Sequence, residues 1–225
     1  MNVWLIVLGV VFLATIILLN TNLFGKKVDQ RKVYLPALAK FLEAKLEPIP
    51  GQENSYEIRF VYDGRPFVYQ DIEDRLGKSC IYKVYLRAAT SSNLKIDFIE
   101  RDRTSIRADV QTLDDMKNPW ARAAEKVVLP RELQDLTVFT NDHSKANELF
   151  ANEKIVKIFS QFKNSSLGRP SISLTVGNGF VVLAFHPPGD SKPTWNDLYY
   201  NASLIEDYLK QVNLVAEAVD ALEKK

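Results

Sequence analysis

The 225-residue chain has very few of the residues that define several protein classes. It has a single cysteine, so it is not a scaffold held together by disulfides. Its nine glycines and ten prolines exclude a collagen-like or low-complexity chain. Only two histidines are present, and a net charge of +1 gives no basic field for nucleic acid. What is left is the composition of an ordinary globular protein with an unusual beginning.

Charge is missing altogether from the first 25 positions. The apolar segment Val3–Leu23 would form a helix of about 31 Å, which matches a hydrocarbon core of about 30 Å. Residues 20–24 make a poor cleavage site and no basic residue precedes the apolar run, which argues against a signal peptide. Cys80 is too distant to anchor a lipoprotein. We expect a transmembrane anchor over residues 1–25, with a cleaved signal as the alternative.

The basic residues on the C-terminal flank of this segment predict its orientation in the membrane. Cytoplasmic flanks of membrane helices are rich in Lys and Arg, and the N-terminal flank has none. We therefore expect a single-pass membrane protein with its N-terminus outside and its C-terminal domain cytoplasmic. The cations either set this topology alone or also contact the anionic lipid of the bilayer. These membrane-proximal residues are Lys26, Lys27, Arg31 and Lys32.

The juxtamembrane stretch, residues 26–50, carries helical spacing. Apolar residues recur at three- and four-residue intervals over Tyr34–Leu46, which predicts a helix with Pro36 in its first turn. Pro48 and Pro50 should end it and make a rigid link.

Residues 51–134 read as an antiparallel β sub-domain with a connection. Period-two alternation predicts a four-stranded meander from about 56 to 100. Asp63-Gly64 predicts its first hairpin, because this pair accepts positive φ. Residues 101–134 should form a surface connection with some short helix.

Residues 135–225 read as a β-α-β-β-α sub-domain. This order packs two helices on one face of a small antiparallel sheet, so the fold class is α+β. The expected elements are a strand at 136–140, N-cap residues at 141–144, a helix to 162, strands at 171–176 and 180–186 around Gly177-Asn178-Gly179, and a helix at 204–222.

The last helix carries a heptad seam. It could pair with a second copy as a coiled-coil homodimer, but it spans under three heptads and follows a sheet that needs covering. We expect it to pack on its own sheet. The seam consists of Ile205, Tyr208, Val212, Val215, Val219 and Leu222.

No catalytic, cofactor or metal site is predicted. Cys80 lies in a strand pattern without a neighbouring base, and His143 and His186 lack metal-ligand spacing. The acidic groups 71–74 and 114–115 do not match a calcium loop and should lie in solvated loops.

Residues 82–87 combine aromatic and basic side chains, as single-strand binders do. The strand is formed around Tyr82, Lys83, Tyr85 and Arg87. Because the chain lacks net basic charge, we predict no nucleic-acid partner.

Several apolar patterns of the last third support a resemblance. They are Leu136–Asp142, Ala146–Phe150, Ile172–Val176 and Phe180–Ala184, followed by the apolar terminal helix. Over 136–222 the chain resembles an uncharacterised family of bacterial single-pass membrane proteins with a C-terminal domain of unknown function. The resemblance implies a bacterial source and a membrane setting, and it brings no catalytic residues.

The sequence therefore favours a membrane-anchored cytoplasmic interaction or scaffold domain over an enzyme. Two alternatives stay open. A sensor domain would need an apolar cavity between sheet and terminal helix, and an enzyme of unrecognised hydrolytic type would need a cleft with convergent polar groups.

Overall fold

The computed structural model describes residues 30–76, 79–100, 127–162, 171–186 and 202–224. The chain forms two compact units, Met1–Leu38 and Ala39–Lys225. The predicted anchor, with Lys26 and Lys27, lies outside the described residues, whereas Arg31 and Lys32 belong to the first helix, α2 (Gln30–Phe41). Within the described ranges, no helix has the length and hydropathy needed to span a bilayer.

The second unit is α+β, as the sequence predicts. Its strands are β1 (Leu46–Pro48), β2 (Tyr56–Tyr62), β3 (Arg65–Leu76), β4 (Ser79–Ala89), β5 (Ile96–Glu100), β6 (Leu136–Thr140), β7 (Ser171–Gly177) and β8 (Phe180–His186). This unit begins with the last residues of α2. The helices that follow are the 3₁₀ turn η2 (Arg131–Leu133), α4 (His143–Phe150), α5 (Glu153–Phe162) and α6 (Ala202–Leu222).

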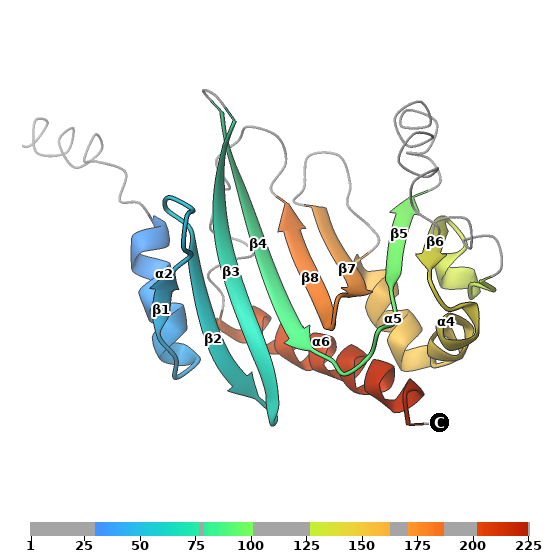
Figure 1. The fold of residues 1–225 in the computed structure, drawn as a ribbon. Coiled ribbons are helices and arrows are strands. Elements are labelled where there is room, and N and C mark those ends of the chain that lie inside the picture. The colour runs from blue at the N-terminus through green and yellow to red at the C-terminus, as the bar shows by residue number, and fades with distance from the viewer. Residues whose placement is uncertain (1–29, 77–78, 101–126, 163–170, 187–201, 225) are drawn as a thin grey trace, which may run out of the picture. The chain divides into compact units, whose positions relative to one another are not determined.

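All eight described strands form one antiparallel sheet in the order β1-β2-β3-β4-β8-β7-β5-β6 (Figure 1). The strands of the two predicted sub-domains thus share a sheet, because β4 pairs with β8 from Val84–Phe185 to Ala89–Phe180. The predicted four-stranded meander is wrong in its last strand. β5 does not pair with β4, but with β6 and β7. Alternating hydrophobicity shows that a segment is a strand, but it does not show which strand pairs with it. Here β8 occupies the position beside β4 that was predicted for β5.

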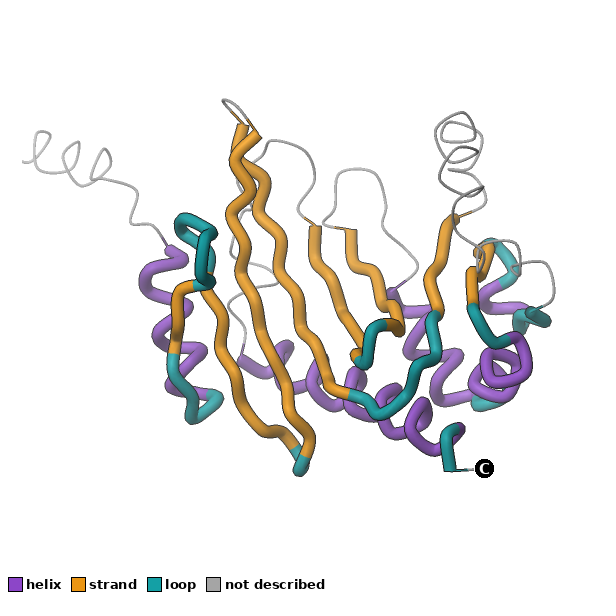
Figure 2. Tube along the Cα trace, in the orientation of Figure 1, coloured by secondary structure: helices purple, strands orange, loops and turns teal. Residues whose placement is uncertain are grey.

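Helices α4, α5 and α6 lie on the same face of this sheet (Figure 2). α6 packs on β4 and β8, while α5 packs on β7 and α6. The sheet side chains beneath them are almost fully buried, as Tyr69, Leu86 and Leu183 show at 2% exposure or less. The helices thus cover one apolar face, as antiparallel sheets allow, and leave the other face to polar and half-buried residues.

The first helix ends earlier than its apolar spacing predicts. Glu43 adopts φ +52°, its N–H donates to the Lys40 carbonyl at 3.2 Å, and the Ala44 N–H donates to the Ala39 carbonyl at 2.9 Å. This pair of bonds is a Schellman motif, which stops a helix. Leu46 then pairs with Ile58 in β1 rather than extending the helix, because the edge of β2 offers it a partner. Pro36 lies inside α2 and not in its first turn.

Both predicted hairpin turns are confirmed. Asp63 and Gly64 have φ of +50° and +74°, and Asn178 and Gly179 have φ of +53° and +77°. These positive values fit a two-residue turn between antiparallel strands.

The predicted helix up to residue 162 is instead two helices. Asp142 caps α4 by accepting from the Lys145 N–H at 3.0 Å. Asn152 interrupts the run after Ala151, because its side chain accepts from the Lys154 N–H at 3.1 Å and so starts α5.

Candidate docking groove between β2 and α6

Arg65 holds the hairpin of β2 and β3 against the terminal helix. The guanidinium donates to the Asp220 carboxylate at 2.6 Å and to the Ala89 carbonyl at 2.5 Å. The other oxygen of Asp220 accepts from the backbone N–H and the hydroxyl of Ser91, at 2.8 and 2.9 Å. Burial acts to raise the pKa of Asp220, but the bonds from Arg65 and Ser91 outweigh it and hold this pKa below its ordinary value.

Asn213 extends the same cluster along α6. It is only 5% exposed and its side-chain oxygen accepts from Arg65 at 3.0 Å. Its amide donates to Asp63 at 3.3 Å and to Glu217 at 2.9 Å. We call these residues the Arg65 clamp: Asp63, Arg65, Ser91, Asn213, Glu217 and Asp220. The clamp fixes how β2 lies beside α6, since its bonds join the hairpin and the segment after β4 to this helix or stay within the helix.

A groove of about 550 Å³ lies between β2 and α6 and includes the residues that follow the end of α2. It is lined by Phe41, Leu42, Glu43, Phe60, Val61, Tyr62, Glu206 and Leu209. Leu209 is 1% exposed and forms part of its floor. Phe60 stacks on the buried Phe67 with ring centroids 5.6 Å apart, which supports the β2 side.

Two large apolar side chains of this groove face water. Phe41 is 48% exposed and Val61 is 69% exposed. Val61 also breaks the polar alternation of β2, because Glu57 and Arg59 occupy the two preceding positions on the same strand face. That face is opposite to α6, so the Val61 side chain lies at the rim of the groove, where β1 no longer pairs with β2. Scattered exposed apolar residues are normal, but Phe41 in the groove and Val61 at its rim lie at one site that a partner can cover.

Two glutamates line the groove, and among the described residues only one of them is in an ion pair. Glu206 is paired with Lys210 one helical turn later at 2.8 Å, and this bond raises the pKa of Lys210. Glu43, in contrast, follows the helix end in an exposed left-handed turn. A cation brought by a ligand would find Glu43 at one wall of the groove.

The helix-free sheet face carries a small polar cluster. Glu57 accepts from Arg59 at 2.7 Å and from Gln70 at 3.1 Å, and Arg87 lies over the Tyr85 ring at 5.2 Å. Burial acts to raise the pKa of Glu57, but these donors and the charge of Arg87 outweigh it, so its pKa lies below the ordinary value. The Arg87 Nε and the Gln70 Oε1 in this cluster are buried without a hydrogen-bond partner in the described part of the chain, so only part of its polar atoms is satisfied.

The period-two alternation predicted for the meander is present in β4 where its side chains are described. Lys83, Tyr85 and Arg87 share the helix-free face, and Val84 and Leu86 are buried on the other. The side chain of Tyr82 lies outside the described part of the structure.

The acidic group at 71–74 is not a solvated loop. All of it lies in β3, and Asp71 is 1% exposed on the helix-covered face. The strand continues past the expected boundary because β4 pairs with it as far as Leu76–Ser79. Asp114 and Asp115 lie outside the described residues.

The candidate nucleophile and ligands occupy separate elements. Cys80 lies in β4 paired with Arg75, His143 opens α4, and His186 ends β8 paired with Ser171. In the ranges with described placement, no group of three or more His, Cys, Asp or Glu is arranged to hold a metal ion.

The heptad seam of α6 is buried within this chain. Its six residues are between 0% and 8% exposed, whereas Leu214 on the outer side of the helix is 45% exposed. The seam therefore packs inside the domain. A homodimer formed through this C-terminal helix stays a prediction.

Sequence reasoning missed the groove and the Arg65 clamp. The only signal in the sequence was Val61, an apolar residue at a polar position of an otherwise alternating strand. The clamp joins residues 65 and 220, and no local pattern indicates such a pair.

Comparison of the chain with protein-family models, curated proteins and solved structures found no match. The resemblance to a bacterial membrane family stays a prediction.

Proposed function

We propose that this chain is an interaction module held at a membrane by residues 1–25, and that its domain docks a partner protein in the groove between β2 and α6. The observation that carries the proposal is the exposure of Phe41 and Val61 at one groove. Lys26, Lys27, Arg31 and Lys32 would keep the domain on the cytoplasmic side.

The groove specifies the chemistry of that partner. Its apolar walls favour a partner segment with aliphatic or aromatic side chains, which would remove Phe41 and Val61 from water. Glu43 favours a Lys or Arg beside that anchor, since Glu206 is already paired with Lys210. The Arg65 clamp keeps the walls in place, so the site needs little rearrangement before it binds.

Site-specific photocrosslinking in membranes tests the groove. A photoreactive phenylalanine analogue placed at Val61 in the full chain should give one discrete protein adduct. The substitution Phe41→Asp in the same chain should reduce that adduct about tenfold or more, because it puts an unpaired charge into the apolar contact.

The chain offers a matched control at Val128, which is 80% exposed and does not line the groove. The analogue at Val128 should give no equivalent adduct, and Val128→Asp should leave the Val61 adduct unchanged. Equal labelling from both positions, or an adduct that survives Phe41→Asp, would contradict the proposal.

A sensor of small apolar molecules is a second candidate. The groove lies between the sheet and the terminal helix, and its volume of about 550 Å³ is that of a small-molecule site. Native mass spectrometry of the full chain released from its membrane separates the two. A bound small molecule that leaves with Phe41→Asp, and no crosslinked protein, would favour the sensor.

A further inference from the structure

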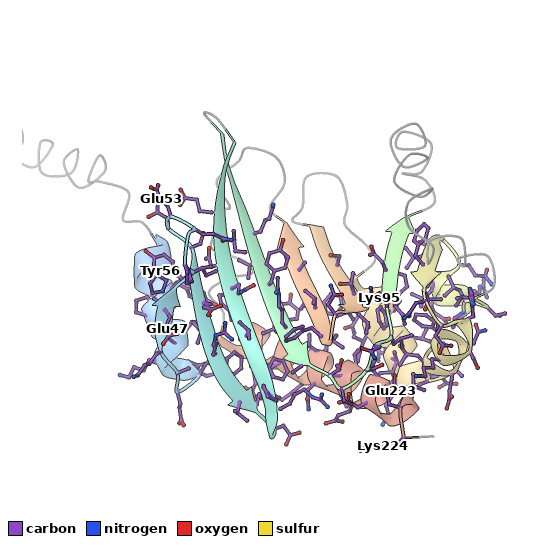
Figure 3. The ribbon with its side chains drawn as sticks, viewed as in Figure 1. Glu47, Glu53, Tyr56, Lys95, Glu223 and Lys224 are labelled. Atoms are coloured by element: carbon purple, nitrogen blue, oxygen red, sulfur yellow. The ribbon has the colours of Figure 1, made fainter. Side chains whose placement is uncertain are left out.

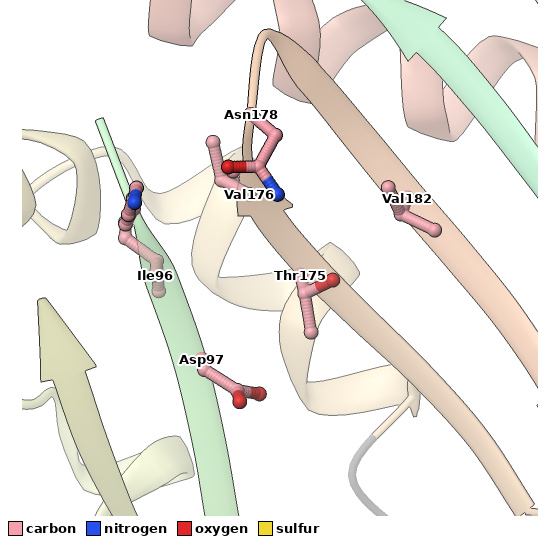
Figure 4. A pocket seen from close by; sticks show the side chains of 8 residues that line it. Ile96, Asp97, Thr175, Val176, Asn178 and Val182 are labelled. Carbon is pink, nitrogen blue, oxygen red and sulfur yellow. The ribbon is translucent and has the colours of Figure 1, made fainter. Parts of the chain in front are cut away.

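Strands β5 and β7 are neighbours in the sheet but are barely paired. β5 pairs with β6 through all of its five residues, and β7 pairs with β8 through all of its seven. Between β5 and β7 the register holds only one pair, Ile96 with Val176. Beyond that pair the two strands diverge, as Figures 1 and 4 show.

The divergence leaves two inner strand edges facing a gap. Alternate residues of a strand direct their N–H and C=O groups to the same side. Alternate residues of 97–100 and of 171–175 therefore direct backbone donors and acceptors into the gap, where no described strand pairs with them. An unpaired edge is a template for another strand.

A cavity of about 240 Å³ lies at the narrow end of this gap, beside the Ile96–Val176 pair. It is lined by Lys95, Ile96, Asp97, Thr175, Val176, Gly177, Asn178 and Val182. Figure 4 shows Asp97 on β5 and Thr175 on β7 at its opposite sides. Its polar lining comes from both strands, so a guest between them would meet an acid on one side and a hydroxyl on the other.

β5 presents different chemistry on its two faces. Phe98 packs with Phe150 and Phe159 on the helix side, with ring centroids 5.9 and 5.0 Å away. Asp97 points to the opposite side, as strand alternation requires. A guest strand placed beside β5 would therefore need alternating apolar and polar side chains.

Asp97 makes no ion pair in the described part of the chain. The hydrogen bond recorded for its carboxylate comes from the Phe98 N–H at 2.8 Å, and Lys95 lines the same cavity without an ion pair to it. Asp97 is exposed on the helix-free face, yet the surrounding protein displaces enough water to raise its pKa, against the effect of the Phe98 bond. A guest ammonium or guanidinium group would stabilise the ionised form.

We propose that the gap between β5 and β7 receives an extended segment of a partner polypeptide, which pairs with both inner edges and places a Lys or Arg side chain against Asp97. Since β5 and β7 are antiparallel, a single inserted strand runs antiparallel to one and parallel to the other. This surface does not share a residue with the groove between β2 and α6, so each site can fail without the other.

Hydrogen–deuterium exchange on the full chain tests the insertion. Two probes are used: an acetylated octapeptide of alternating lysine and valine, and its glutamate–valine counterpart. The lysine peptide should slow exchange of amides in 97–100 and 171–175 and bind about tenfold more tightly than the glutamate peptide at neutral pH.

Asp97→Asn should bring the two peptide affinities within about twofold of each other without changing the circular dichroism of the chain. The control Asp207→Asn removes the same charge from an exposed position of α6 and should keep the preference. Three results overturn the proposal: slow exchange in the free chain at those alternate amides of 97–100 and 171–175 that face the gap and do not bond to β6 or β8, equal binding of the two peptides, or a preference that survives Asp97→Asn. Protection confined to 41–43 and 60–62 also overturns it, because it places the peptide in the other groove.

Discussion

At the scale of single residues, the Arg65 clamp is the most informative feature of the domain. The side chains of Arg65 and Asp220 are only 16% and 18% exposed, and their charges meet at 2.6 Å. Surface ion pairs contribute little to stability, but a mostly buried pair that loses one partner leaves a charge without compensation. The Arg65 clamp therefore affects stability mainly through the free energy lost when one of its charged partners is removed.

Replacing Arg65 with Met should lower the free energy of unfolding by about 2–4 kcal/mol, because Asp220 and Asn213 would lose their donor. Urea denaturation followed by circular dichroism measures this. The double variant Arg65→Met with Asp220→Asn should recover part of the loss, and strictly additive effects would show that the two residues are not coupled.

The carboxylates of the domain should make it sensitive to acid. Glu57, Asp220 and Glu223 have pKa values below their ordinary values, so the unfolded chain binds more protons than the folded one near pH 4. Their stabilising contribution is complete above about pH 5 and is lost as the pH falls through the folded-state values. Asp97 acts in the opposite sense, since its raised pKa makes its contribution less favourable as the pH rises.

Thermal unfolding between pH 3 and pH 7 checks this sign. The midpoint should fall steeply below about pH 4.5, and Asp220→Asn should reduce the steepness. A midpoint that rises on acidification would mean that Asp97 outweighs the three depressed acids.

At the scale of elements, the sequence predicts the secondary structure of each segment more reliably than its position in the sheet. The strands at 56–62, 136–140, 171–177 and 180–186 and both hairpin turns follow from alternation and turn residues. The early end of α2 does not, because Leu42 and Leu46 keep helical spacing through the Schellman motif. The break at Asn152 was missed for a similar reason, since the apolar stripe continues across the cap.

The candidate sites were harder to predict than the elements. The groove joins β2 to α6, and the gap joins β5 to β7, so both depend on strand order. Strand order here is set by the pairing of β4 with β8, which no local pattern encodes.

The packing of α6 gives an element-scale prediction. Val215→Asp should destabilise the domain by about 4 kcal/mol or more, because Val215 is 0% exposed and the new charge would have no partner. Leu214→Asp is a matched control at the neighbouring, 45% exposed position and should change stability by about 0.5 kcal/mol or less.

Unfolding free energies and light scattering of the two variants decide between packing and pairing. If Val215→Asp changed only the oligomeric state and left the unfolding transition intact, a coiled-coil role for the seam would be favoured.

Across the whole molecule, the division after Leu38 separates the N-terminal segment from a domain with its own sheet and helices. The end of α6 is tied in by Glu223, which accepts from Lys145 at 2.7 Å and from Ser92 at 2.5 Å (Figure 3). These two bonds hold the end of α6 to α4 and to the segment that precedes β5.

Deletion of residues 1–25 should leave a soluble, folded domain, because the apolar segment is expected to contact lipid and not the sheet. Circular dichroism and size-exclusion chromatography check the deletion. Aggregation of the shortened chain would mean that the segment packs on the domain.

A reporter protein fused after Lys225 tests the predicted orientation in the membrane. It should report a cytoplasmic location, and a signal from the other side of the membrane would contradict the orientation.

The pairing of β4 with β8 has a consequence for how the chain is made. Ala89 pairs with Phe180, so the edge of β4 leaves the ribosome about ninety residues before its neighbour does. At about 5–20 residues per second, that edge waits roughly 5–20 s, and the helix that covers both strands arrives last of all. During synthesis β4 therefore exposes an unpaired strand edge. A chain stalled before α6 should become a substrate for chaperones or proteases.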